Sequence, residues 1–99
     1  MTTAQRLRHV LDESLGPLPH CELINESHMH NVPKGSETHF KLIIVSNAFE
    51  NLPLVQRHRK VFHVVNKELQ ANGGTIHALS ITAKTTAEWD AIQSEGGLR

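Results

Sequence analysis

The sequence predicts a single α+β domain in which a three-stranded mixed sheet packs on helices. Three observations favour this class. Apolar residues recur with helical spacing in three segments, short β-branched runs lie between these segments, and 99 residues suffice for one domain. The predicted order is α-β-β-α-(α)-β-α, with the middle helical stretch either continuous or broken in two. Such a domain has two layers, one of strands and one of helices.

The first helix is predicted from a capping box and one apolar face. Thr2 and Gln5 form a T-x-x-Q box, in which each side chain pairs with the other residue's backbone N–H. Gly16 and Pro17 end the helix. The apolar residues that share one helical face are Leu7, Val10, Leu11 and Leu15.

Three segments are predicted to be strands: 20–27, 39–46 and 75–83. The second, HFKLIIVS, is apolar on both of its faces, which is typical of a central strand. A helical crossover joins the second strand to the third. Since such connections are right-handed, the third strand is expected to run parallel to a neighbour.

The middle helix is predicted to begin at Leu54 and to stop at Asn72-Gly73-Gly74. The last helix begins with a second capping box, Thr85 to Glu88, and contacts the domain through Trp89 and Ile92. The domain is predicted to cover residues 1–93, followed by a flexible tail at 94–99. The residues expected on the buried face of the middle helix are Leu54, His58, Val61, Phe62, Val65 and Leu69.

Composition limits the classes of function. Ten basic and ten acidic side chains cancel, so the chain has no overall attraction for nucleic acid. One cysteine cannot form an internal disulfide, which favours a reducing compartment. No apolar run is long enough to span a bilayer, and the N-terminal segment lacks a secretory pattern. The expected location is the bacterial cytoplasm, or the cytosol or mitochondria of a eukaryote.

Histidine is the unusual component, with eight residues in the chain. Three of them, His28, His30 and His39, lie in or next to the segment ESHMHNVPKGSETH. Imidazole is a common metal ligand, so this segment is a candidate site. The sequence has no G-x-S-x-G, P-loop, C-x-x-C or H-E-x-x-H motif, and an enzyme is not expected.

Three motifs together carry a resemblance to a known family. N-V-P-x-G-S-E-x-H-F, R-H-R and H-A-L-S occur in this order, and the chain resembles the BolA family from about Leu7 to Trp89. The resemblance implies an α-β-β-α-α-β fold related to class II KH domains, usually with a final helix. It also implies a monothiol glutaredoxin as partner. With glutathione, the two proteins share a [2Fe-2S] cluster that is not tightly bound to the isolated chain.

The resemblance implies particular cluster ligands. His30 precedes Asn-Val-Pro and matches the family's loop ligand, and His77 in H-A-L-S matches the histidine shared across the family. His28 is an accessory candidate, although a solvated loop histidine is the simpler interpretation. Cys21 precedes the loop and does not match the family's loop cysteine. Without the resemblance, His77 would be interpreted as a half-buried, hydrogen-bonded strand residue.

Other polar residues receive structural or contact roles. His39 is expected to be structural or to orient a ligand through a hydrogen bond. His58 is expected to pack inward from the middle helix. Arg57, Arg59 and Lys60 are expected to be exposed and to contact a partner or nucleic-acid phosphate, with a merely solvated basic face as the alternative.

The leading functional prediction is an adaptor in iron–sulfur cluster trafficking, assembly or iron sensing. The alternative is a KH-like DNA-binding transcriptional regulator of stress response and cell morphology. KH domains grip nucleic acid with a GXXG loop, and no two glycines of this chain are three residues apart. A third class is an interaction domain that binds glutaredoxin without a metal.

Overall fold

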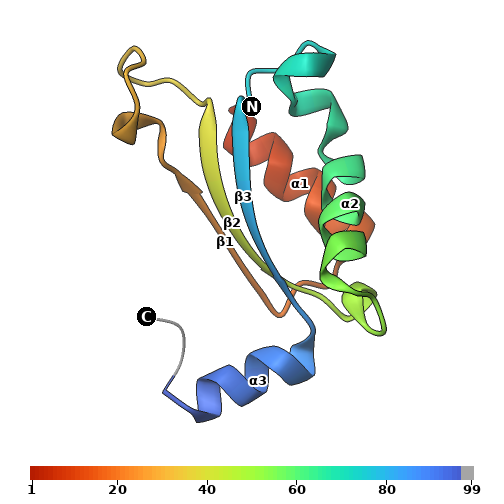
Figure 1. Ribbon diagram of the computed structural model, residues 1–99. Helices are drawn as coiled ribbons and strands as arrows, with labels where there is room; N and C mark the ends of the chain where they lie inside the picture. The colour runs from red at the N-terminus through yellow and green to blue at the C-terminus, as the bar shows by residue number, and fades with distance from the viewer. Residues whose placement is uncertain (97–99) are drawn as a thin grey trace.

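The computed structural model describes residues 1–96, which form one three-stranded sheet and three α-helices (Figure 1). The predicted α+β class and element order are confirmed. The optional second part of the middle helix is a pair of short 3-10 helices, Asn66–Glu68 and Gln70–Asn72. The elements are α1 (Thr3–Leu15), β1 (His20–Asn25), β2 (His39–Val45), α2 (Leu54–Val64), β3 (Ala78–Lys84) and α3 (Thr86–Ser94).

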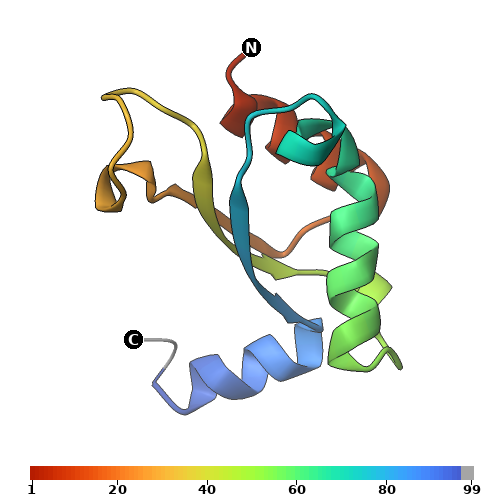
Figure 2. The ribbon, with the colours of Figure 1, turned by 45° about the horizontal axis from the view of Figure 1, so that its top comes forward.

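The strand order in the sheet is β1-β2-β3, with β1 antiparallel and β3 parallel to β2. The predicted central strand and the predicted parallel pair are both confirmed. Helices α1 and α2 lie together on one face of the sheet, whereas α3 lies beyond the end where β3 finishes (Figures 1 and 2). Because β2 and β3 are parallel, both begin at the opposite end of the sheet from α3.

The core lies between the sheet and the pair α1 and α2. From α1 it receives the predicted apolar face, and both predicted capping boxes are present, at Thr2 and at Thr85. Strand β2 has buried residues on both faces, which explains its uninterrupted apolar sequence. The fully or almost fully buried core residues include Leu7, Leu11, Phe40, Leu42, Ile44, Phe49, Val61 and Val65.

The buried face of α2 differs from the predicted one. Arg57, Val61 and Val65 form the inner row at i, i+4 and i+8, and Val65 is the C-cap residue. Leu54 is 61% exposed and Phe62 is 37% exposed, so the prediction that they pack inward is wrong. His58 is half-buried. Arg57 occupies the inner row in their place, where its guanidinium donates to the Leu52 and Ala83 carbonyls.

Helix α3 is held by a few polar and aromatic contacts, because none of its residues is fully buried. Arg57 donates to both carboxylate oxygens of Glu88, at 2.6 and 3.2 Å. The Trp89 ring stacks on His20 with a centroid distance of 4.4 Å. The predicted tail begins at the last residue of α3, and its residues 97–99 lie outside the described part of the chain.

The Arg57–Glu88 pair predicts a specific loss of stability in acid. Hydrogen bonds from Arg57 lower the pKa of Glu88 from 4.5 to about 2. The carboxylate therefore stabilises the fold fully above pH 4.5, and this contribution disappears as the pH falls toward 2. Urea unfolding between pH 6 and pH 2 is expected to show wild type more stable than Glu88→Gln at pH 6, with the two curves converging in acid. A constant difference across this range would contradict the prediction, and Glu95→Gln serves as an exposed control.

Candidate functional site: a histidine cluster

Three histidines meet at the end of the sheet where β2 and β3 begin. His30 lies in the β1–β2 loop (residues 26–38), His39 is the first residue of β2, and His77 immediately precedes β3. The His30 and His39 rings stack with centroids 3.6 Å apart, and the His39 and His77 rings are 5.4 Å apart. Both predicted cluster ligands therefore lie beside His39. His39, predicted as a structural or orienting residue, contacts both; the three are called the histidine cluster below.

A buried serine ties the β1–β2 loop to the start of β2. Ser27 is 3% exposed, and its Oγ accepts hydrogen bonds from the N–H groups of Thr38 (3.0 Å) and His39 (3.1 Å). The Ser27 N–H donates to Asn25 Oδ1 (3.0 Å), and the Asn25 amide donates to the Ser36 carbonyl (3.0 Å). These bonds fix both ends of the segment that carries His30.

Thr38 connects the loop with the segment that carries His77. Its carbonyl oxygen accepts hydrogen bonds from the N–H groups of His77 (2.7 Å) and Ala78 (3.1 Å). Its hydroxyl lies 2.8 Å from Nδ1 of His39. Ser27 and Thr38 thus hold all three histidine-bearing segments in one hydrogen-bonded unit. Sequence analysis missed both residues in this role, because neither pattern nor spacing identifies them.

Strand β3 begins later than predicted, and this changes the setting of His77. The predicted strand began at residue 75, but Ile76 pairs with Leu69 in an isolated bridge, and β3 starts at Ala78. The cause is the turn after α2, whose Glu68 carbonyl accepts the Ile76 N–H. His77 is exposed, so the interpretation as a half-buried strand residue is wrong. Its Nδ1 lies 3.0 Å from Oε1 of Gln70.

The neighbours of His39 affect its protonation. Partial burial lowers the pKa of the His39 ring below its usual value, and the nearby His30 and His77 rings lower it further. Each of these effects disfavours the charged form of the His39 ring. A neutral imidazole has one ring nitrogen that donates a hydrogen bond and one that accepts.

His28 lies apart from the histidine cluster. It belongs to a short 3-10 helix, Ser27–Met29, and not to the extended chain in which it would face the same way as His30. Its side chain is exposed and borders a small pocket of about 210 Å³ that is also lined by Pro33, Lys34 and Gly35. Its accessory ligand role stays a prediction.

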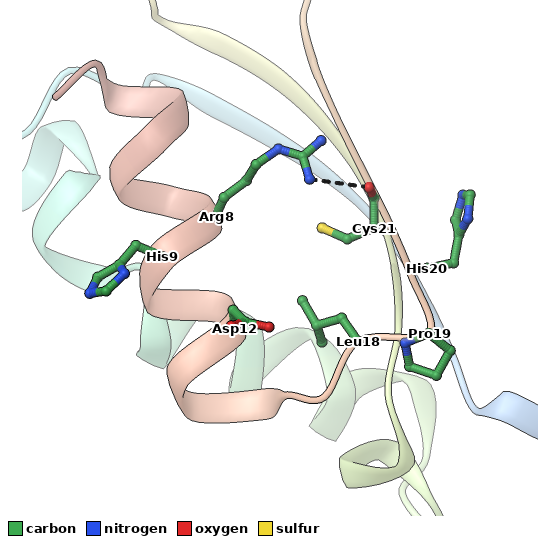
Figure 3. Close-up of a pocket in the computed structure, with 7 residues that line it drawn as sticks. All are labelled: Arg8, His9, Asp12, Leu18, Pro19, His20 and Cys21. Carbon is green, nitrogen blue, oxygen red and sulfur yellow. Dashed lines mark hydrogen bonds between the residues drawn. The ribbon is translucent and has the colours of Figure 1, made fainter.

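Cys21 lies at the opposite end of β1 from the loop, facing α1 (Figure 3). It borders a pocket of about 540 Å³, where Nη1 of Arg8 donates to the Cys21 carbonyl at 3.4 Å. Burial raises the pKa of the Cys21 thiol, so the thiolate that binds metals is disfavoured. Cys21 packs against the core and supplies no ligand to the histidine cluster.

The three basic candidates on α2 separate into two groups. Arg57 is only 7% exposed and donates to the carbonyls of Leu52 and Ala83, so the prediction that it is exposed is wrong. Arg59 and Lys60 are exposed, as predicted. They lie on the helical face of the domain, and α2 has no acidic residue. Only these two cations of the three are available to another molecule.

His30 and His77 are the two side chains that would bind one iron of a shared cluster. In residues 1–96 no group of three or more His, Cys, Asp or Glu side chains is arranged to hold a metal ion. His30 and His77 are nevertheless exposed, and both contact the His39 ring. Two imidazoles can take the place of two thiolates on one iron of a [2Fe-2S] cluster. At such a site the other two ligands would come from another molecule.

The role assigned to Ser27 leads to a prediction. Ser27→Ala removes the acceptor of two backbone N–H groups, so the free energy of unfolding is expected to fall by about 1–3 kcal/mol. Hydrogen exchange of the Thr38 and His39 amides is expected to accelerate. The matched control is Ser94→Ala near the end of α3, where little change is expected. Unchanged protection of the His39 amide in Ser27→Ala would contradict the assignment.

The fold indicates the class of protein, and comparison with known proteins identifies its family. The fold and the histidine cluster define a small α+β domain with exposed histidine side chains at one end of its sheet. The family model described as "BolA-like protein" matches residues 11–88. The chain belongs to the BolA-like family. Among residues 1–96, no helix has the length and apolar character needed to cross a membrane.

Individual relatives agree with this assignment. Human "BolA-like protein 1" is 49% identical over 83 residues, covering 84% of this chain and 58% of the human protein. The Escherichia coli "DNA-binding transcriptional regulator BolA" is 36% identical, covering 94% of this chain and 85% of that protein. The structure of BolA1 from Arabidopsis thaliana superposes with a TM-score of 0.78 at 38% identity, covering 89% of this chain and 96% of that one. The chain thus spans less than two thirds of the human relative's length.

Proposed function

We propose that this protein is an adaptor in iron–sulfur cluster trafficking, assembly or iron sensing. It binds a monothiol glutaredoxin and, together with that partner and glutathione, holds a [2Fe-2S] cluster. His30 and His77 are its two ligands. The observation that carries the proposal is the contact of both exposed rings with His39 at one end of the sheet.

The ligand chemistry explains why a partner is needed. A [2Fe-2S] cluster has four ligands, two on each iron, and two histidines supply only half of them. The only cysteine, Cys21, is half-buried at the far end of β1. The remaining thiolates are those of the glutaredoxin and of glutathione. Because imidazole is neutral, a His-ligated iron carries less negative charge, and its reduction potential is higher than with four thiolates.

Visible circular dichroism tests the proposal. The purified chain is titrated, without oxygen, into a cluster-loaded monothiol glutaredoxin in the presence of glutathione. A new spectrum that saturates at one chain per glutaredoxin is expected. An unchanged spectrum would overturn the proposal. A stable complex without visible absorption would instead indicate an interaction domain that binds glutaredoxin without a metal.

DNA binding is the second candidate, and two observations favour it. The relatives from Escherichia coli and Vibrio cholerae are named DNA-binding transcriptional regulators, and Arg59 and Lys60 are exposed on a helix without acidic residues. Salt-dependent binding to duplex DNA, lost in the double variant Arg59→Glu/Lys60→Glu, would support it. The same variant is expected to leave the circular dichroism spectrum of the glutaredoxin complex unchanged, so the two functions are separable.

A further inference from the structure

The His77 ring is held through one of its two nitrogens. Nδ1 of His77 lies 3.0 Å from Oε1 of Gln70. An amide oxygen has no hydrogen and can only accept, so this bond requires a proton on Nδ1. In the neutral ring, the lone pair then lies on Nε2. This is the tautomer in which Nε2 can bind a metal.

We propose that Gln70 is a positioning residue that sets the tautomer and orientation of His77 for coordination through Nε2. The inference rests on the proposed cluster function. Metal-binding histidines usually donate their second ring N–H to an oxygen acceptor, which fixes the ring and increases its basicity. Here a side-chain amide is that acceptor, and it is in place before any metal arrives.

The backbone places Gln70 beside His77. Leu69 and Ile76 form an isolated parallel bridge, so the residues that follow them, Gln70 and His77, are neighbours. The Gln70 N–H donates to the Ile76 carbonyl at 2.9 Å. The backbone of Gln70 is therefore held next to His77, and the contact between their side chains depends on this bridge.

Two glycines make this turn possible. Gly73 has φ +91°, a conformation that other residues rarely adopt, and its N–H donates to the Gln70 carbonyl. A Cβ on Gly74 would lie 2.1 Å from the carbonyl group of Glu68. The Gly73-Gly74 pair, predicted only as the end of a helix, thus also closes the turn that carries Gln70.

The hydrogen-bond partner of His77 Nδ1 differs in type from that of His39 Nδ1. His39 Nδ1 lies beside the Thr38 hydroxyl, which can either donate or accept and so does not select a tautomer. In residues 1–96, Gln70 presents to the histidine cluster its amide oxygen, an acceptor, and not its NH2 group, which would donate. This selectivity assigns the positioning role to Gln70.

The tautomer can be measured on the isolated chain. Nitrogen-15 labelled histidine and long-range proton–nitrogen correlation distinguish Nδ1–H from Nε2–H above pH 8, where imidazoles are neutral. Wild type is expected to show Nδ1–H at His77. Gln70→Leu, which lacks an acceptor, is expected to lose this preference, whereas Gln70→Glu, which retains one, is expected to keep it. Gln56→Leu, at an exposed position of α2, is the matched control and leaves His77 unchanged.

The second measurement is cluster retention in the glutaredoxin complex. Loss of an outer partner of a metal-binding histidine weakens metal affinity about 10–100-fold. Gln70→Leu is expected to weaken retention against a competing chelator by this factor, with rescue in Gln70→Glu. An Nε2–H tautomer in wild type overturns the inference. The inference is also overturned if Gln70→Leu changes the tautomer of His77 but retains the cluster as well as wild type does. If wild type forms no cluster complex, the proposed function is wrong, and so is the role of Gln70 in cluster binding. The tautomer of His77, measured on the isolated chain, separately shows whether the contact with Gln70 exists.

Discussion

Replacing His77 with alanine is expected to weaken cluster retention in the glutaredoxin complex by more than about 100-fold. The loss of a ligand should exceed the 10–100-fold effect of losing a residue that only supports a ligand. The His77 side chain is exposed, and its one side-chain hydrogen bond is to Gln70, so the fold is expected to persist. Retention is measured by visible absorption during competition with an iron chelator.

The controls for this experiment are other histidines of the same chain. His63→Ala changes an exposed histidine near the end of α2 and is expected to have no effect. His30→Ala is expected to match His77→Ala. His28→Ala is expected to retain the cluster, because His28 lies outside the histidine cluster. Full retention of the cluster in His77→Ala would refute the ligand role of His77. Loss of the cluster in His28→Ala but not in His30→Ala would show that His28, and not His30, is the ligand from the β1–β2 loop.

Replacing Arg57 with alanine is expected to lower the free energy of unfolding by about 2–4 kcal/mol. The buried guanidinium donates to the Leu52 carbonyl (2.8 Å), to the Ala83 carbonyl (3.1 Å) and to both oxygens of Glu88. Removing it takes the guanidinium donors away from the two carbonyls and from the Glu88 carboxylate, which keeps only its hydrogen bond from the Thr85 N–H. Each charged hydrogen bond contributes about 1.5–3 kcal/mol. The sum is reduced because Glu88 is partly exposed and can regain water.

The measurement for Arg57 is urea unfolding, followed by the fluorescence of Trp89, the only tryptophan. Because Glu88 and Trp89 are adjacent on α3, loss of the ion pair is also expected to disturb the Trp89 stack on His20. Arg57→Lys is expected to restore stability only in part, since an ammonium group lacks the planar fork that reaches three partners. Arg59→Ala, on the exposed side of α2, should change stability by less than about 0.5 kcal/mol. An Arg57→Ala variant as stable as Arg59→Ala would contradict this account.

Local signals explain why most of the fold could be predicted. Thr2 with Gln5 and Thr85 with Glu88 form capping boxes that depend on four consecutive residues only. The apolar run of β2 requires cover on both faces, which identifies it as the central strand. These features depend on neighbours in sequence, and the structure retains them.

The errors arose where a distant residue decides the outcome. Arg57 is buried because Glu88, 31 residues later, and two backbone carbonyls complete its hydrogen bonds. A cation in a helix is otherwise expected to face water. The late start of β3 has a similar cause, since Ile76 pairs with Leu69 in the preceding turn and not with β2.

The candidate site was predictable in part. His30 and His77 are recognisable by family resemblance, and the approach of His77 to His39 follows from the parallel pairing of β2 and β3. The supporting residues were not predictable. Ser27, Thr38 and Gln70 act through single hydrogen bonds, and neither residue type nor spacing distinguishes them from ordinary loop residues.

Pulsed electron paramagnetic resonance of the one-electron-reduced complex tests the central claim most directly. The chain is labelled with nitrogen-15 histidine and combined with unlabelled cluster-loaded glutaredoxin and glutathione. Couplings from two nitrogen-15 nuclei to the cluster are predicted, with one lost in His77→Ala and the other in His30→Ala. A cluster signal without any nitrogen-15 coupling would show that the cluster is held without this chain's histidines, and would contradict the account.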